Sequence, residues 1–151
     1  MGVFDTCLSE LAKQTKAIEA LGIPADEIVV RRLPWSDNGT QTVVHRGITF
    51  YPLEEQEAPG TNVREDIGYP CGCAIILPAD HGTAAHVAKV LDCREKIRRR
   101  FIHQRLSGVT LTGGTYLTTK VQHLQINLPR EAHRYEVSSL LIRCWMREPR
   151  G

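Results

Sequence analysis

The longest regular pattern of apolar and polar positions runs from Thr83 to Leu106 and has the length and period of one amphipathic helix. Apolar residues recur there at spacings of three, four and seven, which predicts that one side of the helix packs against a partner surface. That apolar stripe consists of Val87, Val90, Leu91, Ile97 and Phe101, with Ala84 and Ala88 beside it. The opposite side is strongly basic and carries Lys89, Arg94, Glu95, Lys96, Arg98, Arg99, Arg100 and Arg105. The same helix is therefore predicted to close a core and to present a positive field.

Shorter patterns in the first third of the chain predict a second helix and a hairpin. Apolar spacings of three and four indicate a helix over Val3–Leu21, which Gly22 ends. Two β-branched stretches, Glu27–Leu33 and Thr42–Tyr51, flank a turn sequence at Asn38-Gly39. We therefore expect these stretches to pair as an antiparallel hairpin.

Further strands are predicted in the rest of the chain, and Gly47 is expected to mark a bulge or a close approach of two backbones. Tyr69–Leu77 ends in a continuous apolar run, which is typical of a strand covered on both faces. Alternation over 123–128 predicts a half-buried strand, and Tyr135–Arg147 a long terminal one. The terminal strand places Leu140, Ile142, Cys144 and Met146 on one face and Val137, Leu141, Arg143 and Trp145 on the other.

The order of these elements indicates an α+β fold in one domain, 1–151. Strands that follow one another through short turns favour a mostly antiparallel sheet, with two helices packed on one face to give two layers. Between them, the polar stretch at about 53–68 is predicted to be a long exposed loop, usually a functional feature in a compact domain. The opposite sheet face is expected to be partly exposed, with Trp145, Val137 and Leu141 as candidates for closing against another subunit.

Composition is that of an ordinary globular protein, with 42% apolar and 24% charged residues over 151 positions. The formal net charge of +2 is too balanced for a polyelectrolyte binder, but acid gathers at about 54–66 and base at about 94–105. The five cysteines are scattered, which favours reduced and mostly buried thiols. The N-terminus lacks the pattern of a signal peptide, and no segment approaches the roughly 20 apolar residues of a membrane span.

The sequence offers no clear catalytic or metal site. Cys71-x-Cys73, followed by Asp80, His81 and His86, contains metal-competent groups, but its spacing differs from that of the common structural zinc sites. No serine or cysteine lies in a recognisable nucleophile motif, and Gly113-Gly114 lacks the lysine of a phosphate-binding loop. We therefore predict no enzymatic activity, no metal and no cofactor.

Nucleic-acid binding is the main competing interpretation of the basic helix. Arg98, Arg99 and Arg100 could engage phosphates in a strongly salt-dependent manner. Successive helical residues turn by about 100°, however, so three consecutive arginines do not face one way. Aromatic residues amount to only 6%, and none interleave with the basic run to stack on bases. A solvated face, or a surface paired with the acidic stretch of a neighbouring subunit, is the preferred interpretation.

The order of elements resembles that of the small tail-terminator and tail-completion proteins found in the neck of tailed bacteriophages. The resemblance rests on an N-terminal helix, a hairpin, an extended stretch running into NVREDIGYPCGCAIIL, the basic helix through CREKIRRRFIHQRL and the closing strand VSSLLIRCWMRE. It covers nearly the whole chain but depends on element order more than on invariant residues. The length of the predicted loop leaves open whether the chain is a terminator or another neck component, such as a connector, adaptor or stopper.

The resemblance implies a structural virion protein, assembled in the host cytoplasm, that forms a homo-oligomeric ring, often a hexamer, at the head-tail connection. Such a ring ends tail assembly, joins the tail to the head connector, contacts neighbouring neck and tail-tube proteins and lets DNA pass. It implies no catalytic residues, and a small basic nucleic-acid-binding module remains the alternative. Complementary charges predict that Arg94, Arg98 and Arg99 meet acidic residues of a neighbour. The candidate contact residues are Glu54, Glu55, Glu57, Arg64, Glu65, Asp66, Arg94, Arg98, Arg99, Trp145 and Arg147.

Overall fold

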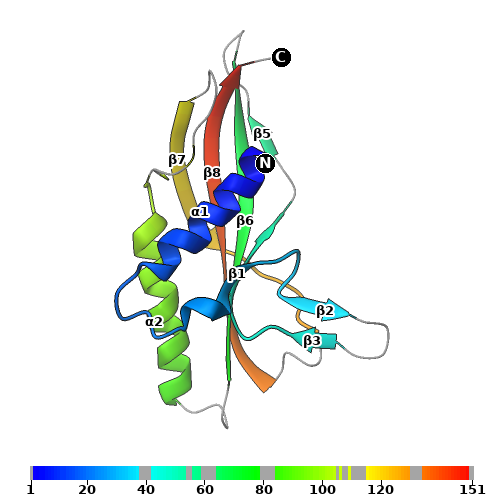
Figure 1. Cartoon of the computed structure of the whole chain (residues 1–151), viewed down its shortest axis with the longest axis vertical. Coiled ribbons are helices and arrows are strands. Elements are labelled where there is room, and N and C mark those ends of the chain that lie inside the picture. Colours follow the sequence, from blue (N-terminus) through cyan, green and yellow to red (C-terminus); the bar gives the residue numbers. More distant parts are fainter. Residues whose placement is uncertain are drawn as a thin grey trace.

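The computed structural model describes residues 2–37, 42–53, 56–58, 64–78, 84–104, 106, 109, 115–129 and 134–149. Within these ranges the chain forms two α-helices, one short 3-10 helix and eight strands, arranged as in Figure 1. In chain order they are α1 (Val3–Lys16), η1 (Ala25–Glu27), β1 (Ile28–Val30), β2 (Trp35–Asp37), β3 (Thr42–Val44), β4 (Gly47–Pro52), β5 (Gln56–Ala58), β6 (Arg64–Pro78), α2 (Ala84–Phe101), β7 (Thr115–His123) and β8 (Tyr135–Pro149).

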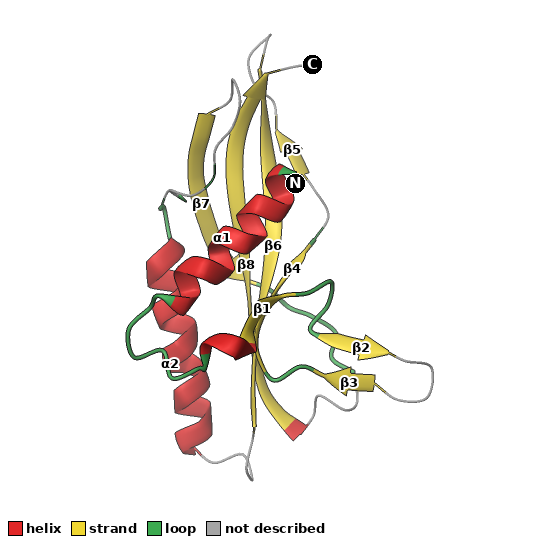
Figure 2. Ribbon diagram, in the orientation of Figure 1, coloured by secondary structure: helices red, strands yellow, loops and turns green. Residues whose placement is uncertain are grey.

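One sheet dominates the molecule, in the strand order β1-β4-β6-β8-β7, with β5 paired to β6 beyond the end of β4. All neighbouring pairs in this sheet are antiparallel except β1 with β4, which is parallel. The longest pair joins β6 to β8 over 15 registered positions, from Arg64 with Pro149 to Pro78 with Tyr135. Both helices lie across the same face of the sheet (Figure 2), so the α+β prediction with a mostly antiparallel sheet is confirmed.

The predicted hairpin between Glu27–Leu33 and Thr42–Tyr51 is wrong in its pairing. The second stretch breaks at His45 and Arg46, so it supplies two strands, β3 and β4. Strand β3 pairs antiparallel with β2 in a separate small sheet, and neither strand pairs antiparallel with β1. After the break, β4 returns alongside β1 in the parallel direction, with Ile28 beside Ile48. The Asn38-Gly39 turn between β2 and β3 lies outside the described residues.

Gly47 explains how the chain makes this return. Its φ of +108° lies in a region that side-chain-bearing residues rarely adopt. A Cβ atom there would lie 2.3 Å from the carbonyl oxygen of Glu27. The expected close approach of two backbones at this glycine is therefore confirmed, and it brings the start of β4 against the end of η1.

The predicted long loop at about 53–68 is wrong over much of its length. Gln56–Ala58 forms β5, which pairs with the β6 residues Asp66, Ile67 and Gly68. Strand β6 begins at Arg64, five residues before the predicted start at Tyr69, because β8 continues to pair with it. The polar composition misled the prediction, since strands whose hydrogen bonds are satisfied by two neighbours need no apolar run. Glu54, Glu55 and residues 59–63 lie outside the described ranges.

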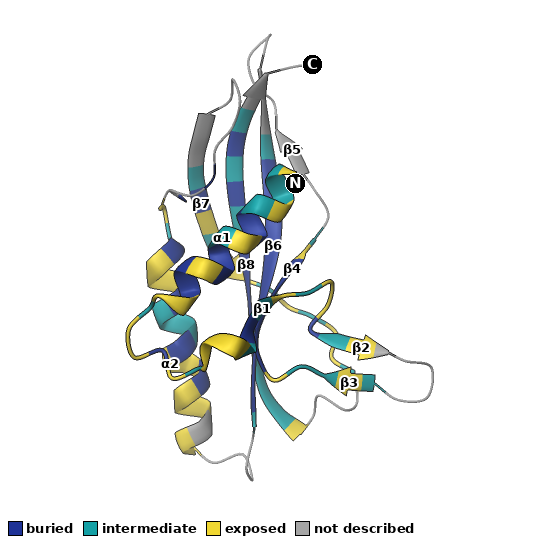
Figure 3. Ribbon diagram, viewed as in Figure 1, coloured by how far each residue is buried: buried dark blue, intermediate teal, exposed yellow. Residues whose placement is uncertain are grey.

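The main core lies between the helices and the sheet, as Figure 3 shows by the buried positions along β6 and β8. Strand β6 contributes Cys71, Cys73, Ile75 and Leu77 to it, and β8 contributes Leu140, Ile142, Cys144 and Met146. A smaller cluster occupies the opposite face, where Tyr51, Ala74 and Ile76 are buried. Burial of β6 on both faces is therefore confirmed.

The inner stripe of α2 differs from the predicted one. Val90, Ile97 and Phe101 are buried as expected, together with Cys93, whereas Val87 and Leu91 are 38% and 55% exposed. The buried set follows one helical face because its spacings are three and four residues. The predicted stripe mixed two neighbouring faces, and Val87 and Leu91 belong to the outer one.

Three other boundaries also differ from the predictions. Helix α1 ends at Lys16 rather than at Leu21, and the chain then turns through positive φ values at Ala20 and Gly22. The alternating segment after His123 is irregular rather than a strand, while the preceding Thr115–His123 forms β7. The alternation over 123–128 reflects partial cover of the sheet, since Leu124 packs beside the smaller cluster. The prediction of β8 over Tyr135–Arg147 is confirmed with an extension to Pro149.

Candidate subunit interface

Arg94 ties α2 to the sheet and is the best-anchored residue of the basic helix. Its Nη1 donates hydrogen bonds to Ser138 Oγ at 2.7 Å and to the Ser139 carbonyl oxygen at 2.9 Å. Its Nη2 lies 3.2 Å from Nδ1 of His123. Because the guanidinium is already bound within the chain at three points, Arg94 serves first to hold α2 on β8.

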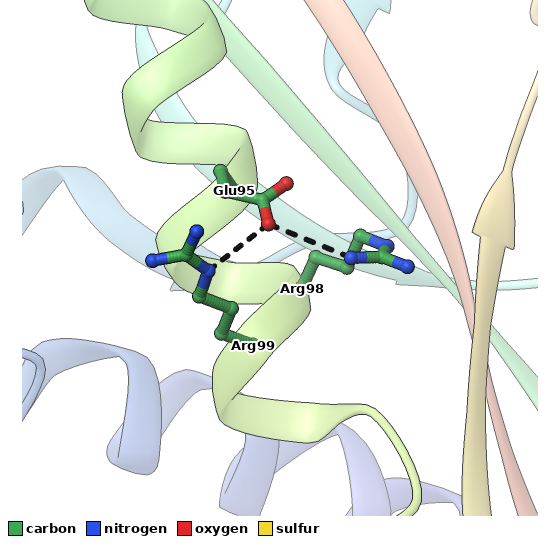
Figure 4. Close-up of polar contacts among 3 residues, drawn as sticks. All are labelled: Glu95, Arg98 and Arg99. Carbon is green, nitrogen blue, oxygen red and sulfur yellow. Dashed lines mark hydrogen bonds and ion pairs between the residues drawn. The ribbon is translucent and has the colours of Figure 1, made fainter.

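Arg98 and Arg99 face solvent and share one carboxylate, as Figure 4 shows. Arg98 Nη1 lies 3.5 Å from Glu95 Oε1, and Arg99 Nε lies 3.0 Å from the same atom. Two positive side chains on one negative group leave a net positive charge. Exposed ion pairs of this kind contribute only about 0–1 kcal/mol to the free energy of unfolding. These two arginines can therefore exchange Glu95 for another carboxylate at little cost.

The outer face of α2 is apolar toward its N-terminus and charged toward its C-terminus. Ala84, Val87, Ala88 and Leu91 are all exposed, and they follow one another at helical spacings of one, three and four residues. We call these four residues the outer apolar strip. The helix dipole favours basic residues near the C-terminus of a helix. Arg98, Arg99 and Arg100 in the last turn of α2 therefore also stabilise the helix itself.

Four of the predicted contact residues, Glu57, Arg64, Glu65 and Asp66, lie on a different flank of the molecule. Glu57 is on β5, and Arg64, Glu65 and Asp66 are in the first part of β6; the structure places their backbones and not their side chains. Strand β8 occupies one edge of β6 along its whole length, so β5 pairs with the other edge. Helix α2 packs over β8, β6 and β7. Within one chain, β5 and the outer face of α2 are thus on opposite flanks, as Figure 1 shows.

Trp145 and Arg147 lie near the end of β8, and both are half-buried. The guanidinium of Arg143 lies 5.9 Å from the centroid of the Trp145 ring, and the indole packs over Gly68 of β6. The indole nitrogen Nε1 is buried and finds no hydrogen-bond partner among the described residues. Of the other candidates on this face, Leu141 is buried and Val137 packs against the smaller cluster, so the chain itself covers much of that surface.

The thiols belong to the core and not to a site. All five cysteines are buried thiols outside any disulfide, and Cys71 and Cys73 face the helices together. Burial raises the pKa of Cys73 far above its ordinary value and that of Cys93 to about 11, so both are neutral thiols at neutral pH. Within the described ranges no three metal-competent side chains come together. Asp80 and His81 lie outside those ranges.

A basic cleft that the sequence interpretation missed lies beside the β2–β3 hairpin. It is open, has a volume of about 610 Å³ and is lined by Arg31, Arg32, Leu33, Trp35, Ser36 and His45. We call it the hairpin cleft. The signal in the sequence was a pair of arginines close to a tryptophan, but Arg31 and Arg32 fall within the predicted strand Glu27–Leu33.

Comparison with known proteins returns no relative: no protein-family model and no curated protein matches the chain. Neither α1 nor α2 has the length and apolar character needed to cross a membrane.

Proposed function

We propose that this chain is a structural subunit of the virion of a tailed bacteriophage. It forms a ring at the head-tail neck or at the top of the tail tube, ends tail assembly and joins the tail to the head connector. The observation that carries the proposal is the placement of α2 and β5 on opposite flanks of one subunit. Two different surfaces on opposite flanks are what a head-to-tail contact between identical subunits requires, and such contacts close into rings when the rotation permits.

The outer face of α2 supplies one half of this contact. Its outer apolar strip provides area to bury, and Arg98 and Arg99 provide positive charge that Glu95 only partly balances. The β5 flank of the next copy supplies the other half, where Glu57 lies on β5 and Asp66 in the first part of β6. Glu54 and Glu55, which precede β5 in the sequence and lie outside the described residues, are proposed to add acidic charge. Opposite charges on the two halves set the register and speed of association, while apolar burial contributes most of the affinity.

The partners of the ring follow from its place in the virion. Six copies are proposed, in contact with the adjacent neck and tail-tube proteins, and with DNA passing without sequence-specific contact. Assembly takes place in the host cytoplasm. Another neck component remains an alternative assignment, because a connector, adaptor or stopper ring would use the same kind of contact.

The test is the absolute mass of the purified chain by light scattering after size exclusion, with negative-stain imaging of any large species. Rings of about six copies are expected. The double reversal Arg98→Glu with Arg99→Glu should dissociate them, whereas Lys120→Glu, an exposed residue of β7, should not. Adding Glu54→Arg and Glu57→Arg to the α2 reversal should restore the ring, because the charges are again complementary.

Two outcomes would contradict the proposal. If the rings survive the α2 reversal, the proposed contact between α2 and β5 is wrong. A monomer that binds duplex DNA tightly and loses affinity steeply with salt would favour the small basic nucleic-acid-binding module, since phosphate contacts release counterions.

A further inference from the structure

The hairpin cleft has the size of a small-molecule site and lies away from α2. Its volume of about 610 Å³ falls within the range of roughly 300–1,000 Å³ that is common for ligand sites. It is formed by the segment that joins β1 to β2, by the first residues of β2 and by the start of the loop after β3.

Among the described residues that line the cleft, the charged ones are both basic. They are Arg31 and Arg32. The Arg31 Nη1 donates a hydrogen bond to Thr49 Oγ1 at 3.0 Å, which fixes that guanidinium from the β4 side. Arg32 is exposed, so its side chain is free to close over a ligand. Paired guanidinium groups with one of them already oriented form a good site for a phosphate group.

Neutral hydrogen-bonding groups lie next to this charge. Nε2 of His45 lies 2.7 Å from Ser36 Oγ. Burial and the neighbouring Arg31 lower the pKa of His45, so the imidazole is neutral at neutral pH.

An apolar wall completes the cleft and decides what kind of anion it fits. Trp35 is half-buried and lines the cleft, and Leu33 beside it is 45% exposed. A small inorganic anion or an acidic side chain has no planar apolar part to cover these groups. A nucleotide does, because its base can stack on an indole while its phosphate meets the arginines.

We propose that the hairpin cleft binds a nucleotide unit, with the phosphate at Arg31 and Arg32 and the base against Trp35. The unit is either a free nucleotide or one residue of a single strand. The site is independent of the ring contact proposed above, since it uses neither α2 nor β5.

The test is isothermal titration of the full chain with inorganic phosphate, with a deoxynucleoside monophosphate and with a short single-stranded oligonucleotide. The nucleotide should bind about tenfold or more tightly than phosphate because stacking on an aromatic ring adds to the phosphate contact. Arg32→Ala should weaken both by about tenfold, as expected for loss of a charged hydrogen-bond donor, while Lys120→Ala should leave both unchanged. A single strand that binds far more tightly than the free nucleotide identifies nucleic acid as the source.

A second variant separates stacking from charge. Trp35→Leu should reduce nucleotide affinity to that of inorganic phosphate and leave phosphate affinity unchanged. Should that variant fail to fold, quenching of Trp35 fluorescence in a Trp145→Phe background reports the same contact. Equal affinities for phosphate and nucleotide in the unaltered chain would overturn the proposal, as would an equal loss from Arg32→Ala and Lys120→Ala. Binding of an acidic peptide in preference to the nucleotide would also overturn it.

Discussion

The two faces of the main sheet are covered in different ways. On one face, α1 and α2 place buried residues at helical spacings over β6 and β8, which gives one continuous core. On the other face, the cover comes from short or irregular pieces, including Val44 of β3, Leu53 and Leu124. The first cover repeats one pattern over several turns, whereas the second joins single residues from distant parts of the chain.

Because of this difference, the two faces should contribute unequally to folding stability and should differ in how well they tolerate substitutions. A helix buries several side chains through one element, so the cost of ordering its backbone is shared among them. Irregular segments bury one or two side chains each and gain less for each residue ordered. We therefore expect the helix face to dominate folding stability and the opposite face to contribute in small separate amounts.

The largest expected effect is on the helix face. Ile97→Ala should lower the free energy of unfolding by about 2–5 kcal/mol, because the side chain is fully buried between α2 and the sheet. The matched control is Leu91→Ala on the same helix, where the leucine is 55% exposed. This change should alter the free energy of unfolding by less than about 0.5 kcal/mol. Chemical denaturation of both variants measures the difference, and equal losses would show that the outer apolar strip is covered within the subunit.

A second expected effect distinguishes the faces by pH. Burial raises the pKa of Cys93 on the helix face from 9.0 to about 11, and that of Tyr51 on the opposite face from 10.0 to about 12. Each group stays neutral in the folded state while it ionises in the unfolded chain, so its contribution is complete below the unfolded pKa. That contribution is lost as pH rises through the folded pKa.

Stability under reducing conditions should therefore begin to fall near pH 9, by an amount on the order of 2 kcal/mol from Cys93 alone. Tyr51→Phe should remove only the part of the loss that starts near pH 10, and Cys93→Ala should reduce the part that starts earlier. Unfolding curves at pH 8, 10 and 11 measure both. A stability that stays constant over this range would contradict burial of the two groups.

The smallest expected effect is on the irregular cover. Leu124→Ala removes one half-buried side chain from the smaller cluster and should cost about 1 kcal/mol. The neighbouring exposed Gln125→Ala should stay within about 0.5 kcal/mol of the unaltered chain. A loss at Leu124 as large as that at Ile97 would show that the two faces contribute equally to folding stability.

The sequence was sufficient to predict the type and position of the elements that have long repeated patterns. The terminal strand and the basic helix were predicted in place because alternation or helical spacing persists over many residues in each. It was insufficient where a tertiary contact decides the outcome. Parallel pairing of β1 with β4 depends on the close approach at Gly47, and β5 depends on the edge that β6 offers beyond β4. Neither event leaves a periodic trace in the local sequence.

The candidate site divides in the same way. Arg98 and Arg99 were predicted on an exposed face from charge alone, and they lie there. Arg94 has the same residue type, yet it binds Ser138, Ser139 and His123, because its position on α2 faces β8. The hairpin cleft was missed because its residues come from two separate segments, 31–36 and His45, which lie together only once the chain has folded.

The position of β8 in the sheet also has a consequence for how the chain folds. Its partners on β6 lie between 57 residues away, for Pro78 with Tyr135, and 85 residues away, for Arg64 with Pro149. Pairing at such separations closes large loops before it gains contacts, which slows folding to roughly the millisecond-to-second range. Strand β8 also fits between β6 and β7, both of which are synthesised before it. Until β8 arrives, β6 exposes a long apolar edge, and this interval is when the nascent chain is most exposed to aggregation and most in need of chaperone protection.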